Sequence, residues 1–291
     1  MAGIIIKACN PFRYAYTLTH SLVPFIQQHH KLLVLTGAGV STASGIPDYR
    51  DLQGSWKHRK PMTYQEFISS HQARQRYWGR SAIGWERFKQ AKPNSAHESL
   101  AKLESMERVS MLITQNVDRL HSQAGSRQVI DLHGRLDKVI CLDCGNLEER
   151  ERVHQFLLAE NPFLKSLSAE SAPDGDAQLA EHVDLDGIRL PGCEHCGGVI
   201  KPHVVFFGEN VPRARVDRCY AALSRADALL VVGSSLMVYS GFRFVRRANE
   251  LGLPVAVINR GKTRADDLIQ MKVEADCSAT LEALVSASVT G

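Results

Sequence analysis

Four of the seven cysteines form two Cys-x-x-Cys pairs, Cys141/Cys144 and Cys193/Cys196. Two such pairs supply the four thiolates of a closed tetrahedral zinc site. Redox chemistry, disulfides and chance are the alternatives, and the matched spacing disfavours them. Because cysteines take all four ligand positions, none is left for a catalytic water, and the spacing predicts one structural zinc ion. The long gap between the pairs predicts a protruding loop.

A glycine-rich stretch, Gly37 to Ser41, follows a short apolar run. Its small residues let the backbone approach a pyrophosphate and direct N–H groups at it. The third glycine of the usual dinucleotide fingerprint would fall at Thr42, so the pattern of the dehydrogenases is not met. A tight turn between a strand and a helix explains the same residues equally well.

The next segment, Gly45 to Arg50, combines a proline, an acid, an aromatic residue and a base within six positions. A loop of this composition can close over an aromatic ring and exclude water from it. In isolation, a surface turn with an ion pair between Asp48 and Arg50 is the better interpretation.

Thr114 to His121 begins where another apolar run ends. Within it, Gln115, Asn116 and Asp118 carry amide and carboxylate groups that suit ribose hydroxyls and a carboxamide. A helix N-cap formed by Asn116 or Asp118 is the simpler alternative. We interpret His121 as a packing residue rather than a catalyst.

His133 stands beside Gly134 at the end of a short predicted strand, residues 129–132. A histidine in this position can face a cleft and act as a general base. Most of the twelve histidines are expected to be structural, so the assignment of His133 depends on its neighbours.

Four apolar runs must position these polar segments. They span residues 31–35, 111–113, 228–232 and 253–258, and each ends in a polar or glycine-containing cluster. Continuous runs of Val, Ile and Leu are typical of parallel strands that are covered on both faces. Ligands of such sheets bind beyond the carboxyl ends of the strands, where the polar clusters would meet.

The segments between the runs have other patterns. Helical spacing covers residues 97–108, 216–225 and 241–251, and the aromatic, basic stretch 62–89 predicts a helical lobe. Residues 168–187 are rich in Ala, Asp and Gly and predict a surface loop.

The composition is that of an ordinary globular chain: 291 residues, 44% hydrophobic, with a formal charge of +4. This charge balance is not a nucleic-acid footprint, and no apolar run is long enough for a membrane span, so neither partner is expected. The N-terminal residues have the pattern of neither a secretory signal nor an Arg-rich transit peptide. A cytoplasmic location is expected, or the mitochondrial matrix in a eukaryote.

Taken in order, these segments resemble the sirtuin family. The matching strings are GAGVS at Gly37–Ser41, GIPDYR at Gly45–Arg50, TQNVDRLH at Thr114–His121 and HG at His133–Gly134, followed by the four cysteines, KPHVVFFGE at Lys201–Glu209, GSSLMV at Gly233–Val238 and NRG at Asn259–Gly261. Each string alone has modest specificity, whereas the ordered set over about residues 20–285 is highly specific. Tyr49, Ser234 and Ser240 depart from the commoner Phe, Thr and Pro.

The resemblance implies an α/β fold, a Rossmann-like parallel sheet domain with an inserted smaller zinc-binding domain and a helical lobe. The NAD-binding domain would be discontinuous, at residues 20–136 and 204–285, with the lobe at about 52–95. The zinc-binding domain would span residues 137–203.

The resemblance also implies roles for the site residues. The diphosphate and adenosine half of NAD would be held by Gly37, Ala38, Gly39, Ser41, Gly233, Ser234, Ser235, Asn259, Arg260 and Gly261, with Cys277 beside the adenine. The mobile cofactor loop would consist of Pro47, Asp48, Tyr49 and Arg50, and the nicotinamide ribose and carboxamide would contact Gln115, Asn116 and Asp118. His133 would be the base, with Asn116 as a second catalytic residue. The substrate peptide would pair as an added strand with Val204, Val205, Phe206, Phe207 and Gly208 and with the 236–238 loop.

The implied activity is NAD-dependent removal of acyl groups from lysine in protein or peptide substrates. NAD would be a co-substrate, because the acyl group moves to ADP-ribose and nicotinamide is released. Positioning would dominate the rate, with general-base help of about 10²–10⁴-fold.

Tyr77-x-x-Arg80 resembles the pattern with which acid-selective sirtuins pair an acyl carboxylate. With residues 76–78 and 172–176, it resembles the class II branch, the mitochondrial lipoamidase and ADP-ribosyltransferase type. Larger or acidic acyl groups are therefore expected substrates, although Tyr77 and Arg80 fit one face of an amphipathic helix equally well.

Three rival functions follow from the same residues. A protein mono-ADP-ribosyltransferase on this scaffold would consume NAD without releasing an acyl group. A non-catalytic NAD sensor or zinc-ribbon adaptor would need neither His133 nor Asn116. A dehydrogenase is disfavoured by the missing third glycine and by the lack of an acid about 20 residues after the turn.

Overall fold

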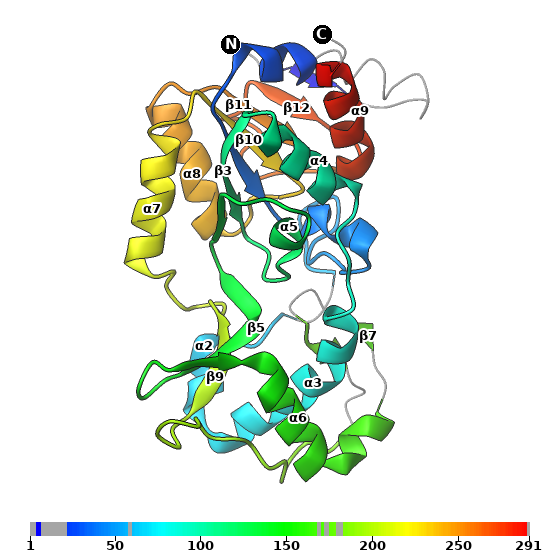
Figure 1. The fold of residues 1–291 in the computed structure, drawn as a ribbon, viewed down its shortest axis with the longest axis vertical. Coiled ribbons are helices and arrows are strands. Elements are labelled where there is room, and N and C mark those ends of the chain that lie inside the picture. Colours follow the sequence, from blue (N-terminus) through cyan, green and yellow to red (C-terminus); the bar gives the residue numbers. More distant parts are fainter. Residues whose placement is uncertain are drawn as a thin grey trace. The chain divides into compact units, whose positions relative to one another are not determined.

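The computed structural model describes residues 4–6, 22–57, 60–167, 170–171, 175–178 and 183–289 (Figure 1). The chain divides into two compact units, which have their own sheets. Unit 1 comprises Met1–Lys57, Lys92–Leu132 and Val211–Gly291, and unit 2 comprises His58–Ala91 and His133–Asn210. Most of the helical lobe expected at residues 52–95 therefore clusters with the cysteine-bearing segments.

Unit 1 is built on a seven-stranded sheet in which every neighbouring pair is parallel. Its order is β1 (Ile4–Ile6), β12 (Met271–Val273), β11 (Val255–Ile258), β10 (Ala228–Val232), β2 (Leu32–Thr36), β3 (Val109–Thr114) and β4 (Val129–Asp131). The four apolar runs are thus confirmed as parallel strands, and the Rossmann-like sheet is confirmed with them. The edge strand β1 and its neighbour β12 were not expected from the sequence.

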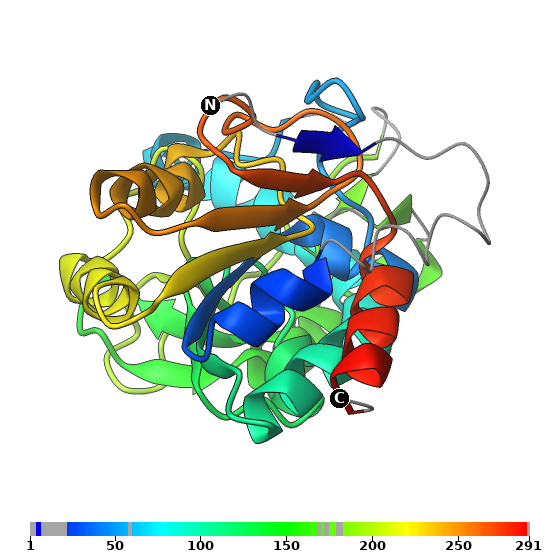
Figure 2. The same cartoon turned by 90° about the horizontal axis from the view of Figure 1, so that it is seen from above.

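Helices cover both faces of this sheet, as Figure 2 shows. Along β2, Leu32 and Val34 pack in one core cluster with residues 22–28, which are helical, and with α4 (Ser95–Ser105) and α9 (Cys277–Val289). Leu33 and Leu35 pack in a second cluster with α7 (Arg213–Leu223) and α8 (Tyr239–Glu250). Successive strand residues point to opposite faces, so a strand buried on both faces is apolar throughout.

The strand order changes direction at β2. The chain continues from β2 to β3 and β4 on one side, whereas β10, β11 and β12 lie on the other. In such a sheet, ligands bind at the carboxyl ends of the strands where the order reverses. Here these are the ends of β2 and β10, from which the glycine-rich turns at Gly37 and Gly233 start.

Unit 2 has an antiparallel sheet in the order β6 (Leu147–Glu149), β5 (Gly134–Cys141) and β9 (Ile200–Val204). Its helices include α2 (Tyr64–Ser69), α3 (His71–Phe88) and α6 (Arg150–Glu160). A capping box between Thr63 and Glu66 starts α2, and the Ser70 hydroxyl accepts the N–H of Ala73 at the start of α3.

The core of unit 2 contains an unusual cation. Arg150 is fully buried, with its guanidinium carbon 5.0 Å from the ring centre of Trp78 and 5.2 Å from that of Trp85. Its Nη2 donates to the carbonyl and hydroxyl of Ser81, at 3.2 and 3.1 Å. Burial lowers the pKa of Arg150 to about 10.

Some predictions fall wholly or partly outside the described residues. Residues 172–174 are among them, as is much of the loop expected at 168–187. Within that loop, β7 (Glu170–Ser171) pairs antiparallel with β8 (Ala177–Gln178). Among the helices of the described part, none is both long and apolar enough to cross a membrane.

Candidate functional site

The turns after β2 and β10 approach each other so closely that only glycine fits. The N–H of Gly37 donates to Val232 O at 3.1 Å, and that of Gly39 donates to Gly233 O at 2.9 Å. A Cβ on Gly37 would lie 2.8 Å from the Cβ of Ser234. Gly233 has φ of +62°, and a Cβ there would lie 2.5 Å from the backbone N of Val40. These glycines leave the open backbone that a pyrophosphate needs.

Ser41 is the centre of a buried polar network beside this turn. Its hydroxyl donates to Asp118 Oδ2 at 2.7 Å and accepts from Asn116 Nδ2 at 3.0 Å. Asn116 Nδ2 also donates to Gly37 O at 3.1 Å. The network therefore joins the end of β2 to the segment after β3, and it orients Asn116 and Asp118 together.

The tautomer of His97 sets the direction of this network. His97 Nδ1 accepts the N–H of Asn94 at 3.2 Å, so the neutral ring carries its proton on Nε2, which faces the Ser41 hydroxyl at 3.4 Å. Burial lowers the pKa of His97 to about 4, which keeps the ring neutral. The Ser41 oxygen thus faces two donors, and its own proton is directed to Asp118.

The carboxyl group of Asp118 is under two opposing influences. Burial raises its pKa, whereas the N–H of Leu120 and the hydroxyl of Ser41 donate to it and favour the charged form. Asp118 Oδ1 accepts the N–H of Leu120, the first residue of α5 (Leu120–Gln123), at 2.9 Å. The N-cap of this helix is Arg119, so the alternative interpretation of Asn116 or Asp118 as the N-cap is wrong.

His121 is a packing residue, as expected. It is fully buried, and its Nε2 lies 2.9 Å from the hydroxyl of Thr36, which in turn lies 2.9 Å from the hydroxyl of Thr114. Thr114 accepts the N–H of Asn116 at 3.1 Å. Burial, and secondarily His97, lowers the pKa of His121 well below its usual value. The ring is a neutral support beneath Asn116.

Gln115 links the same edge to β10. Its Nε2 donates to Thr36 O at 3.1 Å and to the Ser234 hydroxyl at 2.8 Å. A Cβ on Gly241, near the start of α8, would lie 2.4 Å from Gln115 Oε1. The start of α8 is therefore packed directly against this part of the site.

The segment after Gly45 folds back on itself as a strap. Arg50 and Trp56 form an antiparallel bridge, with the guanidinium carbon 4.0 Å from the indole centre, and Arg50 Nη1 donates to Gly54 O at 2.8 Å. The ring of Tyr49 meets the edge of Trp56 at 6.0 Å. Asp48 pairs with Lys57 at 2.5 Å rather than with Arg50. Pro47 lies beside these residues in the chain.

The turn after β11 carries the remaining predicted NAD contacts. Asn259 Nδ2 donates to Arg260 O at 2.8 Å, and Arg260 pairs with Asp276 at 3.2 Å. Gly261 has φ of +79°. Cys277 is buried, its thiol lies 3.9 Å from Ile258 O, and burial raises its pKa to about 12. The burial of this thiol suits a packing role.

In unit 2, His133 is held against the residues that follow β9. It comes one residue after Leu132, whose N–H donates to Thr114 O at the edge of the parallel sheet. The carbonyl of His133 accepts the N–H of Val205 at 2.8 Å, and Gly134 pairs with Val204. A Cβ on Gly134 would lie 2.1 Å from His203 O, so this close pairing requires glycine.

The predicted peptide segment continues from this pairing. Val204 and Val205 are partly exposed, Phe206 is buried in the unit 2 core, and Phe207 and Gly208 lead away from β9. Phe207 O accepts the N–H of Tyr64 at the start of α2 at 2.9 Å.

Tyr77 and Arg80 lie one helical turn apart on α3. Tyr77 is buried in an aromatic cluster, with its ring centre 5.3 Å from that of Phe67 and 5.2 Å from that of Phe206. Arg80 Nε donates to both carboxylate oxygens of Asp176, at 3.2 and 2.9 Å. The guanidinium therefore already has an acidic partner, which sequence reasoning did not identify.

The four paired cysteines converge in unit 2. Their sulfur atoms all lie within 4.8 Å of one another, with Cys141 and Cys196 at 3.5 Å and Cys144 and Cys193 at 3.7 Å. A tetrahedral zinc ion with Zn–S bonds of about 2.3 Å separates its sulfur ligands by about 3.8 Å, whereas a disulfide needs about 2.05 Å. The cysteines thus fit a zinc ion, and the predicted zinc-binding module is confirmed.

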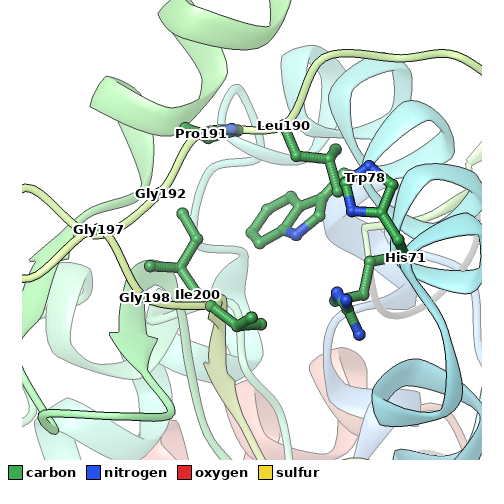
Figure 3. Close-up of a pocket in the computed structure, with 10 residues that line it drawn as sticks. His71, Trp78, Leu190, Pro191, Gly192, Gly197, Gly198 and Ile200 are labelled. Atoms are coloured by element: carbon green, nitrogen blue, oxygen red, sulfur yellow. The ribbon is translucent and has the colours of Figure 1, made fainter.

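A cavity of about 210 Å³ lies beside these cysteines (Figure 3). It is lined by the side of Trp78, by His71 and Arg74 near the start of α3, and by residues 190–192 and 197–200. None of the residues predicted for the site lines it. The cavity is therefore distinct from the residues that carry the predicted chemistry.

The chain is similar to proteins of known family. The Sir2 family model matches residues 37–240. A Bradyrhizobium diazoefficiens protein named NAD-dependent protein deacetylase 2 is 56% identical over 265 residues, which cover 91% of this chain and 97% of that protein. A Xanthomonas campestris protein named NAD-dependent protein deacetylase is 56% identical over 261 residues, which cover 90% of this chain and 89% of that protein.

Solved structures that resemble this chain are also Sir2 proteins. A structure described as Sir2 with p53 peptide and NAD⁺ is 29% identical, superposes with a TM-score of 0.72, and covers 93% of this chain and 98% of its own. A Sir2 homologue in complex with ADP-ribose is 31% identical, with a TM-score of 0.73. The strand-end glycines, the ordered polar network, the four convergent thiols and these matches lead to one conclusion: the chain belongs to the Sir2 family, the sirtuins.

Proposed function

We propose that the chain is an NAD-dependent deacylase that acts on acyl-lysine in proteins or peptides. The observation that carries this proposal is the Ser41 network at the end of β2, which orients Asn116 and Asp118 beside a glycine turn suited to a pyrophosphate. The names of two relatives at 56% identity, both NAD-dependent protein deacetylases, support the same reaction. When bound, NAD supplies the ADP-ribosyl acceptor for the acyl group, and nicotinamide is the leaving group.

The NAD contacts proposed for unit 1 follow the strand ends. Backbone N–H groups around Gly37 to Gly39 and Gly233 to Ser235 would hold the diphosphate. The 259–261 turn and the buried Cys277 would border the adenosine. The strap from Pro47 to Arg50 would cover the nicotinamide end and exclude water, and the Trp56 ring under Arg50 gives it a rigid base.

Asn116, Gln115 and Asp118 would hold the nicotinamide ribose and the carboxamide. Both amides have their donor groups fixed by backbone carbonyls and hydroxyls, so little side-chain entropy would be lost on binding. His133 would take a proton from a ribose hydroxyl, and the chain from Val204 to Gly208 would pair with the backbone of the substrate.

The test follows both products. The protein is incubated with NAD and an acetyl-lysine peptide, and nicotinamide and O-acetyl-ADP-ribose are measured by mass spectrometry. His133→Asn should lower turnover by at least about 10²-fold and leave NAD affinity within a few fold. His71→Asn, an exposed histidine of the same unit, is the control. ADP-ribose on protein side chains without an O-acyl product would support the transferase alternative and refute deacylation.

The acyl preference is a separate proposal. Tyr77 and Arg80 would receive a carboxylate on a larger acyl chain, such as glutaryl. Because Arg80 already pairs with Asp176, such a chain would have to displace that carboxylate or share the guanidinium with it. Because of this contact, we expect only a modest preference for acidic over neutral acyl groups.

The two acyl chains can be compared directly. Arg80→Ala should lower kcat/KM for glutaryl-lysine by a factor that is about three- to tenfold larger than its effect on acetyl-lysine. Arg76→Ala on the same helix, whose guanidinium lies 4.0 Å from Asp186, is the matched control. Equal losses on both substrates would refute the acidic preference and leave the deacylase proposal intact.

A further inference from the structure

Three arginines surround one tyrosine at the start of α8. Tyr239 is 47% exposed, and its ring centre lies 5.2 Å from the guanidinium carbon of Arg243 and 5.8 Å from that of Arg264. Arg246 Nη1 lies 3.4 Å from the tyrosine hydroxyl. Residues 239, 243 and 246 fall on one face of a helix, since they are four and three positions apart. We call Tyr239, Arg243, Arg246 and Arg264 the arginine cluster.

Most of the positive charge of the arginine cluster is not neutralised. Within the part of the chain that the structure describes, neither Arg243 nor Arg264 has a carboxylate within 4.0 Å, and Arg243 Nε is buried without a hydrogen-bond partner. Arg246 reaches Glu250 only at 4.0 Å, and that carboxylate is held at 3.0 Å by Arg247. Stacking on an aromatic ring leaves the in-plane N–H groups of a guanidinium available to a carboxylate.

The arginine cluster is attached to the loop between β10 and α8. The N–H of Arg264 donates to Ser235 O at 2.9 Å, and its Nη1 donates to Met237 O at 3.3 Å. Its guanidinium carbon also lies 4.5 Å from the ring centre of Phe242. The charge is therefore rigidly placed beside residues 236–238, the part of unit 1 expected to pair with the substrate peptide.

We propose that the arginine cluster binds acidic side chains that flank the acyl-lysine in the substrate. This inference rests on the proposed deacylase function. An extended peptide places alternate side chains on one face about 6.5–7 Å apart, so an acid a few residues from the lysine can reach the cluster. A carboxylate suits it better than a nucleic acid does, because guanidinium groups already stack on the exposed tyrosine ring that a base would need.

The experiment uses three acetyl-lysine peptides that differ only in their flanks. Two residues on each side of the lysine are Glu, Gln or Lys, and kcat/KM is measured with NAD in excess. Exposed ion pairs are individually weak, so two or three of them predict a preference of about fivefold to tenfold for Glu over Gln at low salt. The Lys peptide should be the poorest substrate, and the differences should shrink at about 0.5 M salt.

The double variant Arg243→Gln, Arg264→Gln removes the charge and keeps amide donors. Its Glu-to-Gln ratio should fall to within about twofold of one. Arg247→Gln, on the same helix but paired with Glu250, is the matched control and should keep the preference. If the double variant loses activity equally on all three peptides, the arginines only support the loop and the proposal is overturned. If Arg247→Gln lowers the Glu-to-Gln ratio as much as the double variant does, the proposal is overturned, because the preference would then depend on the total positive charge of α8 and not on the arginine cluster.

The remaining outcomes are also decisive. If none of the peptides is deacetylated, the deacylase function itself fails. If all three react at equal rates, only the docking of acidic flanks fails. Strong inhibition by a short single-stranded oligonucleotide that the double variant abolishes, with no preference among the peptides, would assign the arginine cluster to nucleic acid instead.

Discussion

Replacing Ser41 with alanine would remove the hydroxyl that joins His97, Asn116 and Asp118. The strongest of these contacts is the 2.7 Å hydrogen bond to the Asp118 carboxylate. A hydrogen bond to a charged group contributes about 1.5–3 kcal/mol, and the Asn116 amide would lose one of its two acceptors. We expect Ser41→Ala to lower the free energy of unfolding by about 2–4 kcal/mol at neutral pH.

The loss should depend on pH because Asp118 titrates differently in the folded and unfolded states. Burial raises its folded pKa, and the Ser41 hydroxyl opposes that rise. Without the hydroxyl the pKa rises further. A carboxyl group with a raised folded pKa binds more protons in the folded state, so stability falls as pH rises through that pKa. The variant should therefore lose more stability near pH 8 than near pH 5.

Urea unfolding followed by circular dichroism at both pH values measures this difference. Ser126→Ala is the matched control, because Ser126 is also buried but its hydroxyl has no hydrogen-bond partner in the described structure. That variant should lie within about 0.5 kcal/mol of the parent at both pH values. If Ser41→Ala were as stable as the control, or equally destabilised at both pH values, the assigned direction of the network would be wrong.

Three further outcomes follow from the contacts described. Gly37→Ala would place a Cβ 2.8 Å from that of Ser234, so NAD affinity measured by calorimetry should fall by at least about tenfold while circular dichroism stays unchanged. Cys144→Ser should remove the zinc ion, as seen by elemental analysis, and destabilise unit 2 by at least about 3 kcal/mol, whereas Cys219→Ser should retain the metal. Arg150→Met should keep or raise the unfolding free energy, by up to about 4 kcal/mol, because it removes a buried charge that forms no ion pair among the described residues; a loss above about 2 kcal/mol would contradict this.

The segments that carry the chemistry were predictable because their signals are local. A continuous apolar run such as Ala228 to Val232 identifies a strand buried on both faces, whatever its neighbours are. The spacing of Cys141 and Cys144 identifies a zinc knuckle, since two sulfurs on one tight turn suit a tetrahedral ion. Polar residues directly after such strands must gather at one edge of a parallel sheet.

By itself, the sequence determined the four apolar strands of the parallel sheet, which cysteines pair for a metal, and which polar clusters share an edge. Only the tertiary structure decided the partners: Ser41 meets Asp118, 77 residues away in the chain, and Arg80 is neutralised by Asp176, 96 residues away. It also decided that Arg243 and Arg264 share one tyrosine ring. The physical reason is the distance along the chain over which each interaction acts. Strand periodicity and knuckle spacing are set by adjacent residues, whereas the partner of a hydroxyl or a guanidinium depends on which distant segments the core brings together.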